Sequence, residues 1–128
     1  MGHRILQVLT TAYRATLEEQ DDPVLWLTHC LRNNGAPIDL LFRNTAVNYV
    51  VRAQAPAGLT IGQWTQTQPP DIAFEVRALI SKECRAYVVV DDLVARGVHR
   101  DEVLDEIGFV ARAELPALLR SYKHIWQW

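Results

Sequence analysis

Short apolar runs alternate with amphipathic segments along this chain. The runs at residues 4–10, 38–42, 85–90 and 108–110 are mostly apolar, and each is bounded by polar or turn-forming residues. Runs of this length are typical of strands that are buried on both faces. A further candidate strand lies at 125–128. The pattern therefore predicts a series of short strands.

Helices are predicted between these strands. Asp22-Pro23 is typical of an N-cap followed by the first helical residue, and Asn33-Asn34-Gly35 is typical of a helix end. Asp71 marks a second helix start, ahead of apolar residues at helical spacing. The other predicted elements are helices at 46–53, 93–96, 101–107 and 115–122, and a loop at 56–70, where proline and glycine are frequent.

Alternating strands and helices favour one fold class. They predict an α/β protein whose parallel sheet is covered on both faces and built from right-handed crossovers. A length of 128 residues suits one domain, 1–128, and no internal repeat is present.

Composition excludes several function classes. Hydrophobic residues make up 49% of the chain and charged residues 22%, which is typical of a globular protein. The formal charge is −2 and the basic residues are scattered along the chain, so the sequence shows no basic patch that would bind nucleic acid. No apolar run is long enough to span a membrane, and no signal peptide is recognisable. Cys30 and Cys84 form no disulfide framework, so we expect a cytoplasmic protein.

Polar residues gather where the predicted strands end. The carboxyl ends of parallel strands lie at one edge of a sheet, which is where α/β proteins bind ligands. Residues predicted to line a site there, for a small polar ligand or for a partner's extended tail, are Thr10, Thr11, Arg43, Asn44, Asn48, Asp91, Asp92 and Arg112. The alternative is that these loop ends are polar only because they are exposed to solvent.

Familiar catalytic motifs are missing from the sequence. The four histidines share no metal-ligand spacing, and the glycines form no phosphate-binding loop, so neither a metal nor a cofactor is expected. Asp91 and Asp92 are adjacent carboxylates, and their repulsion could raise one pKa for acid–base catalysis. Alternatively, one of the two caps the helix at 93–96.

Three segments carry a family resemblance. The order of elements, RNTAVNYVV at 43–51, YVVVDDLVARGV at 87–98 and LPALLRSYKHIWQW at 115–128 resemble the DsrE/DsrF-like proteins, which are DsrEFH-like and related to TusBCD. This resemblance implies a three-layer α/β/α sandwich with a five-stranded, mainly parallel sheet. It also implies assembly into trimers or hexamers and a link to intracellular sulfur relay.

The resemblance also locates a carrier position. Active members of the family carry a persulfide on a cysteine at the end of the third strand. Aligning the pattern on Arg96-Gly97 places that position at Val89, and valine cannot hold sulfur. We therefore expect a non-carrying subunit or binding module, with a cysteine-bearing relay partner supplying the reactive sulfur.

Two other functions stay open at this stage. Cys84 could be the catalytic residue of an active sulfurtransferase or persulfide carrier, although it precedes the third strand and so lies at the opposite edge. Cys30 is expected to be a small core residue. The scaffold could also serve as a small polar-ligand binding protein. Trp126 and Trp128 lie on a terminal strand, and an aromatic edge strand is either packed by its own helices or buried against another subunit. Together with the assembly that the resemblance implies, this favours a homo-oligomer in each case.

Overall fold

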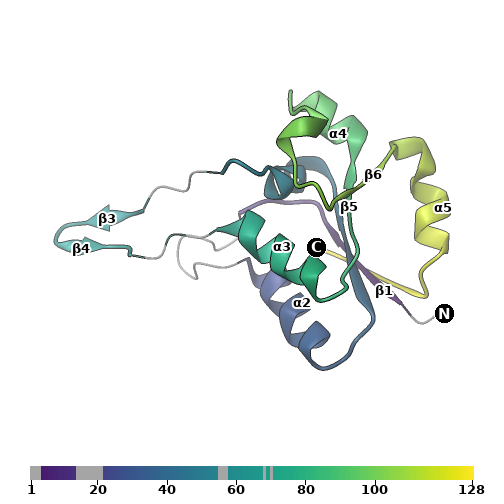
Figure 1. Ribbon diagram of the computed structural model, residues 1–128, viewed down its shortest axis with the longest axis horizontal. Helices are drawn as coiled ribbons and strands as arrows, with labels where there is room; N and C mark the ends of the chain where they lie inside the picture. The colour runs from purple at the N-terminus through teal and green to yellow at the C-terminus, as the bar shows by residue number, and fades with distance from the viewer. Residues whose placement is uncertain (1–3, 14–21, 55–57, 68, 70) are drawn as a thin grey trace.

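A five-stranded parallel sheet forms the centre of the molecule (Figure 1). The computed structural model describes residues 4–13, 22–54, 58–67, 69 and 71–128. The strand order is β6-β5-β2-β1-β7, and every neighbouring pair is parallel. Its strands are β1 (Ile5–Leu9), β2 (Ile38–Phe42), β5 (Ala86–Val89), β6 (Gly108–Val110) and β7 (His124–Gln127). The predicted α/β fold class is confirmed.

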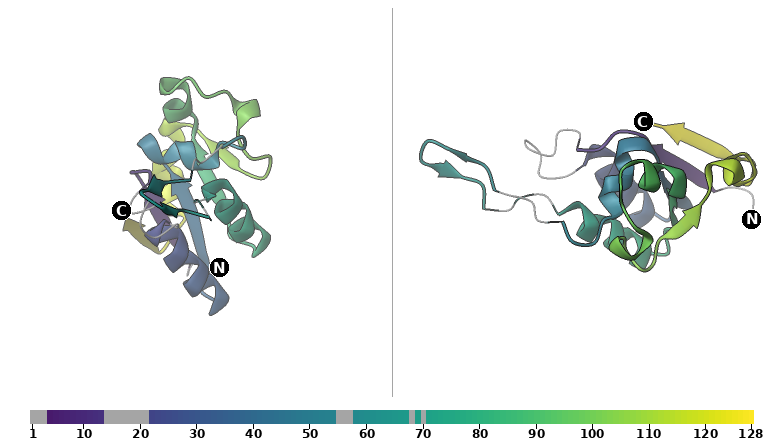
Figure 2. Two further views of the ribbon diagram at one scale, coloured as in Figure 1. Left: turned by 90° about the vertical axis from the view of Figure 1, so that its left-hand side faces the viewer. Right: turned by 90° about the horizontal axis from the view of Figure 1, so that it is seen from above.

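Chain direction explains how the helices are distributed over the two faces. Helices α2 (Pro23–Asn33) and α3 (Ile72–Ser81) cover one face, as Figures 1 and 2 show. From β1 to β6 the chain advances across the sheet in one direction, and right-handed crossovers then place successive helices on the same face. The step from β6 to β7 runs back across the sheet, so α5 (Leu115–Arg120) covers the opposite face.

Each face of the sheet has its own apolar core. Leu40 and Phe42 of β2 pack under α2 and α3 in the larger core. Their neighbour Leu41 points the other way and packs with Leu6, Val8 and Leu115 in the smaller core under α5. All five residues of β2 are buried, as expected for the central strand of a parallel sheet.

The predicted helix starts at Asp22 and Asp71 are confirmed. The Asp22 carboxylate accepts hydrogen bonds from the backbone N–H groups of Val24 and Leu25, at 2.8 and 3.2 Å. Asp71 accepts one from Phe74 at 3.1 Å. After α2, Gly35 takes a φ of 84°, the left-handed conformation that a helix end requires.

Two predicted α-helices are wrong. Residues 46–53 were expected to be α-helical, but the chain forms the 3₁₀-helix η1 (Asn44–Val50). Residues 101–107 were also expected to be helical, but contain only the end of a 3₁₀ turn, η2 (Arg100–Glu102). An isolated antiparallel bridge joins Val51 to Val103, and the Leu104 N–H donates to the Val50 carbonyl at 2.9 Å. This tertiary pairing takes the backbone groups that two longer helices would need.

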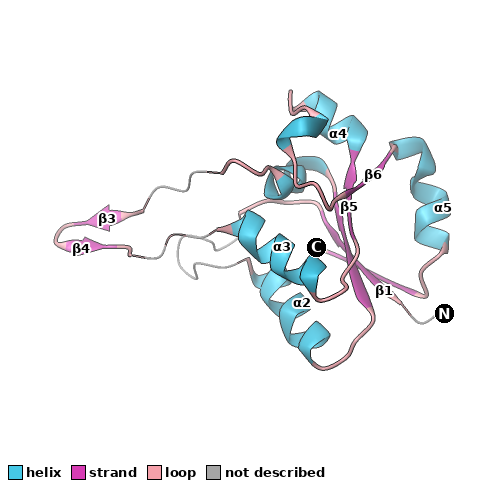
Figure 3. Ribbon diagram, viewed as in Figure 1, coloured by secondary structure: helices cyan, strands magenta, loops and turns pink. Residues whose placement is uncertain are grey.

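The segment predicted as a loop, 56–70, contains a small hairpin. Strands β3 (Thr60–Ile61) and β4 (Trp64–Thr65) pair antiparallel and project away from the sheet (Figures 1 and 3). The loop prediction at positions 56, 57, 68 and 70 lies outside the described residues. Within the described ranges, no helix is long and apolar enough to cross a membrane.

Candidate functional site at the carboxyl edge of the sheet

Parallel pairing brings the carboxyl ends of the strands to one edge of the sheet. Strands β1, β2, β5 and β6 end there, and α4 (Val90–Ala95) follows β5 directly (Figure 1). We call this edge, with the segments that follow the four strands, the carboxyl edge. The eight residues predicted to bind a ligand lie along it: Thr10, Thr11, Arg43, Asn44, Asn48, Asp91, Asp92 and Arg112.

Asp92 joins three of the strand ends. Its Oδ2 atom accepts a hydrogen bond from the Asn44 backbone N–H at 2.8 Å, and its Oδ1 atom lies 2.5 Å from Nη2 of Arg112. The Asp92 side chain is almost buried, whereas 57% of the Arg112 side chain is exposed. A ligand arriving from solvent can therefore reach the cation of this pair while the carboxylate stays in place.

Asp91 occupies the exposed side of the same turn. Its Oδ1 accepts a hydrogen bond from the Arg112 backbone N–H at 2.7 Å, and this bond lowers the pKa of the carboxyl group. A carboxyl group with a lowered pKa is ionised at neutral pH and is not available as a general acid. Asp91 thus holds the segment after β6 in place as a carboxylate.

The predicted cap at 93–96 is wrong. Helix α4 begins at Val90, so both aspartates lie in its first turn, and its N-cap residue is Val89, whose side chain makes no capping hydrogen bond. Negative charge in a first turn still favours the helix through its dipole. The carboxylates themselves bind the neighbouring strand ends, with Asp92 contacting Asn44 and Arg112.

Asn44 has an unusual backbone conformation and an unpredicted partner. Its φ of 51° lies in the left-handed region, which non-glycine residues enter rarely and mostly as Asn or Asp. Its Oδ1 accepts a hydrogen bond from Nη2 of Arg96 at 2.6 Å. The pair Arg96-Gly97 gave the only sequence signal for this contact, and it pointed to the family pattern and not to a role for Arg96 itself.

Arg43 contributes a second cation to the edge. Its backbone N–H donates to the Leu9 carbonyl at 2.9 Å, which ties the end of β2 to the end of β1. The side chain is partly buried, and no hydrogen bond or ion pair joins its guanidinium to another described residue. A partly buried arginine whose guanidinium has no partner among the described residues suits an anionic ligand.

The remaining predicted residues are already engaged or solvent-facing. Thr10 donates its hydroxyl hydrogen to the Trp128 carbonyl at 2.6 Å, and Thr11 is exposed. Asn48 donates from Nδ2 to the Thr45 carbonyl at 3.0 Å. Positions 44 and 48 would share one face of an α-helix, but a 3₁₀-helix has three residues per turn, so their directions differ by about 120°.

Val89 lies where the family resemblance expects the carrier cysteine. Its side chain is fully buried and packs with Leu6, Val8, Leu41 and Val110 in the core under α5. The side chain therefore contributes to the hydrophobic core and presents nothing to a ligand at the carboxyl edge.

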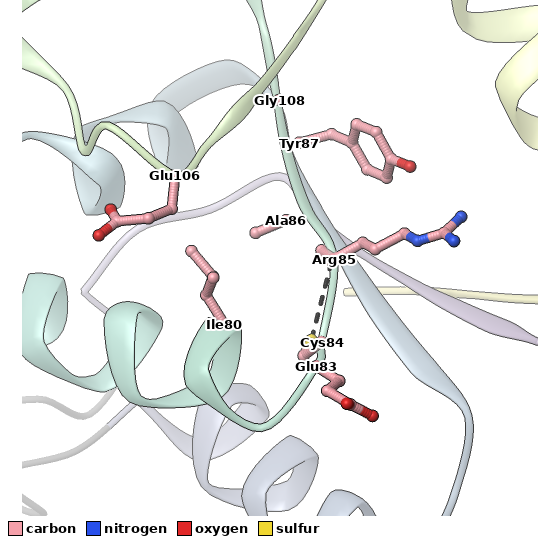
Figure 4. A pocket seen from close by; sticks show the side chains of 8 residues that line it. All are labelled: Ile80, Glu83, Cys84, Arg85, Ala86, Tyr87, Glu106 and Gly108. Atoms are coloured by element: carbon pink, nitrogen blue, oxygen red, sulfur yellow. Dashed lines mark hydrogen bonds between the residues drawn. The ribbon is translucent and has the colours of Figure 1, made fainter.

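Cys84 lies at the opposite edge, just before β5. The residues Ile80, Glu83, Cys84, Arg85, Ala86, Tyr87, Glu106 and Gly108 line a pocket of about 330 Å³ at this amino edge (Figure 4). Cys84 itself is 1% exposed, and its burial raises the pKa of the thiol to about 12, with the nearby Asp39 adding to the effect. The thiolate is the nucleophilic form, so Cys84 is mostly unreactive at neutral pH.

A buried acid at the amino edge was missed by the sequence reasoning. Asp39, inside the apolar strand β2, is fully buried and accepts hydrogen bonds from Arg4 at 2.8 and 2.5 Å. It also accepts from the Tyr122 hydroxyl at 2.6 Å and the Arg85 N–H at 2.9 Å. An aspartate in an otherwise apolar strand was the available signal, because a buried charge requires partners.

Neither cysteine belongs to a candidate metal site among the described residues. Across the part of the chain that the structure describes, no group of three or more His, Cys, Asp or Glu side chains is placed to hold a metal ion. Cys30 is partly buried near the end of α2, and no described cysteine forms a disulfide.

Comparison with known proteins identifies the fold. No protein-family model matches the chain, and no curated protein matches it significantly. Among solved structures, the YchN protein from E. coli aligns over 100% of both chains with a TM-score of 0.71 and 16% identity. The likeness defines a DsrE/YchN-like fold.

Two proteins of unknown function have similar structures. BT1422 from Bacteroides thetaiotaomicron aligns with a TM-score of 0.69 and 12% identity, over 98% of this chain and 94% of its own. MTH1491 from Methanobacterium thermoautotrophicum aligns with a TM-score of 0.64 and 14% identity, over 98% of each chain. At these identities the similarity extends to the fold alone.

Proposed function

We propose that this chain is a DsrE-like protein of intracellular sulfur relay that works as a non-carrying subunit or binding module in the cytoplasm. The observation that carries the proposal is at the end of β5. A buried Val89 stands at the expected carrier position, and the edge beyond it holds the Asp92–Arg112 ion pair in place of a nucleophile.

The alternative of an active carrier rests on Cys84. This thiol is buried at the amino edge, and its raised pKa keeps it protonated at neutral pH. A relay cysteine needs both access to its partner and thiolate character. The environment of Cys84 offers neither, which favours the non-carrying role.

In the proposed role, the carboxyl edge binds what a partner presents. A relay partner carries its persulfide on a cysteine, and a persulfide is anionic at neutral pH. The partly buried Arg43 and the exposed Arg112 supply positive charge, and Asp92 orients Arg112. Such an edge can bind an anionic sulfur group without forming a covalent bond to it.

A small polar-ligand binding protein is the second candidate. The Arg43 guanidinium, which no described residue pairs, and the left-handed Asn44 beside it favour this function, because unusual backbone conformations are often kept where a ligand binds. We also propose that the chain assembles into a trimer or hexamer, as the aromatic strand β7 suggests.

Intact-mass measurement after treatment with glutathione persulfide tests the central proposal. We expect the folded protein to retain no added sulfur on Cys84, and the same protein in denaturant to become reactive there. A Cys30→Ser background removes the more exposed thiol. Sulfur retained by the folded Cys30→Ser variant, and lost in Cys30→Ser/Cys84→Ser, would establish the active-carrier alternative instead.

Calorimetric titration with thiosulfate tests the binding role of the carboxyl edge. We expect Arg43→Gln to weaken binding, because it removes a cation that no other described residue pairs. Arg120→Gln is the matched control, since Arg120 is an exposed arginine at the end of α5, toward the other edge of the sheet. Equal affinities in both variants and the wild type would reject a ligand site at Arg43.

A further inference from the structure

Strand β7 is an edge strand with an exposed apolar surface. It pairs with β1 on one side only, and the right-hand view of Figure 2 shows it as the outer strand of the sheet. All four of its residues are exposed. Ile125, Trp126 and the following Trp128 expose 41%, 38% and 39% of their surfaces. Three large apolar side chains are thus open to solvent along one short edge.

The hydrogen bonds of β7 show which backbone groups remain available. The Trp128 N–H donates to Val8 at 2.9 Å, its carbonyl accepts from Thr10 at 3.2 Å, and the His124 N–H points to Arg4. The even-numbered residues therefore bond to β1. Because backbone direction alternates along a strand, Ile125 and Gln127 direct their N–H and carbonyl groups outward.

Within the described residues, this edge lacks the usual protection against pairing. Natural edge strands are commonly shielded by proline, by inward-pointing charges, by a bulge or by a covering loop. The sequence His124–Gln127 holds no proline, lysine or carboxylate, and its register with β1 is regular. An unshielded aromatic edge is suited to a partner strand.

We propose that β7 pairs with β7 of a second copy of this chain, antiparallel and about a two-fold axis at Trp126. This proposal rests on the assembly part of the proposed function and names its contact. Two five-stranded sheets would then join into one continuous sheet across the axis. Because the axis is two-fold, the pairing agrees with the hexamer of the proposed function, in which it joins subunits in pairs, and excludes a trimer as the final assembly.

The register follows from the outward backbone groups. An antiparallel pair centred on Trp126 places Ile125 opposite Gln127 of the second copy, and each such pair exchanges both of its hydrogen bonds. Trp126 then lies opposite Trp126 of the second copy in a non-hydrogen-bonded pair. In antiparallel sheets such pairs are closer than hydrogen-bonded pairs, with Cα atoms about 4.5 Å apart. Its remaining backbone groups already point to β1, so no polar group is left unpaired.

The side chains also favour a second copy as the occupant. In this register His124 lies opposite Trp128, and no like charges meet within the strand. The central Trp126 pair stacks two large aromatic rings, and cross-strand aromatic pairs are among the favourable ones in sheets. Pairing of β7 with its own copy therefore gives the outward N–H and carbonyl groups hydrogen-bond partners and covers the apolar side chains.

A charge-swap experiment tests the pairing directly, with mass measured by analytical ultracentrifugation. We expect the wild type to associate, and Trp126→Lys and Trp126→Glu each to weaken association on the order of tenfold or more, because each places like charges opposite. Mixing the two variants should restore the assembly. Ile61→Lys, which removes an exposed isoleucine from the β3–β4 hairpin, is the control that should associate as the wild type does.

Disulfide trapping tests the register and does not depend on the charged variants folding. In a Cys30→Ser background, Trp126→Cys should form a covalent dimer on mild oxidation, because Cα atoms about 4.5 Å apart fit disulfide geometry. Trp128→Cys, which faces His124 of the other copy, should not.

Several outcomes would overturn this inference, and they are distinguishable. A monomeric wild type at every concentration removes both the pairing and the proposed assembly. If the wild type assembles, three results would place the interface elsewhere and leave the assembly intact. These are charged variants with the wild-type mass, a mixture of the two charged variants that does not assemble, and two cysteine variants that cross-link equally.

Discussion

Two aspartates, Asp39 and Asp92, lie at opposite edges of the same sheet and differ in which groups pair with their charges. At the amino edge, Asp39 is fully buried and accepts hydrogen bonds from Arg4, Tyr122 and the Arg85 N–H. At the carboxyl edge, Asp92 has one backbone donor, from Asn44, and one largely exposed arginine.

The difference separates stability from binding. Every oxygen of Asp39 already has partners inside the protein, so the cluster locks β1, β2, β5 and the end of α5 together and has no capacity for a ligand. Arg112, the cation paired with Asp92, is largely exposed and can bind a ligand that arrives from solvent. The amino edge is therefore expected to govern folding, and the carboxyl edge binding.

Asp39→Ala should have the largest effect on stability. It leaves Arg4 and the hydroxyl of Tyr122 without their buried acceptor, and breaking a buried ion pair costs about 3–5 kcal/mol of unfolding free energy. Urea unfolding measures the loss. Tyr122→Phe removes one donor only and should cost about 1 kcal/mol. If Asp39→Ala unfolded at the wild-type urea concentration, the proposed division between the edges would be wrong.

Cys84→Ala should change how stability depends on alkaline pH. The folded pKa of Cys84 is raised, so the unfolded chain ionises first as pH rises above about 9, and stability falls until about pH 12. One such proton corresponds to at most about 1.4 kcal/mol per pH unit. The free-energy difference between wild type and variant, measured from pH 7 to 11, should show this slope. No change in the difference would mean that the Cys84 thiol is not buried as described.

Asp92→Asn should affect ligand binding more than stability. Its Arg112 partner is mostly exposed and screened, so a double-mutant cycle with Arg112→Gln should give a coupling of about 1 kcal/mol or less. Removing the negative charge should strengthen thiosulfate binding, because Arg112 is then uncompensated. Weaker binding in Asp92→Asn would instead mean that the orientation Asp92 gives to Arg112 matters more for the ligand than the positive charge it cancels.

Asp91→Asn should have the smallest effect on stability. The residue is exposed, and substitutions at exposed surface positions usually change stability little. Because hydrogen bonding to Arg112 lowers its folded pKa, its contribution to stability is present above the unfolded pKa of about 3.9 and is lost as pH falls through the folded value. An NMR titration that gave Asp91 an ordinary or raised pKa would contradict the contact with Arg112.

Much of the fold could be predicted from the sequence because its signals are local. The apolar runs gave all five strands of the sheet, and Asp22-Pro23 and Asp71 marked the starts of α2 and α3. Two helices were predicted wrongly, since the Val51–Val103 bridge depends on residues far apart in the chain. The apolar residues within 101–107 suggested a helix, but Val103, Leu104 and Ile107 are buried in the core without forming one.

The candidate site was predictable in position but not in detail. The carboxyl ends of neighbouring parallel strands lie at the same edge of a sheet, so Asn44, Asp92 and Arg112 were expected to lie near one another. That Arg112 would bind Asp92 while Arg96 binds Asn44 depends on side-chain directions set by the tertiary structure. Asp39 and Arg4 were missed because their pairing needs the register of β1 on β2.

An ¹H–¹⁵N NMR titration with thiosulfate tests most directly whether the carboxyl edge is the functional edge. The Asn44 and Arg112 amides bond to Asp92 and Asp91, and the Arg85 amide bonds to Asp39, so each edge carries its own reporter. We predict that the Asn44 and Arg112 signals shift with saturating thiosulfate while the Arg85 signal stays in place. A shift at Arg85 with the other two unmoved would contradict the account.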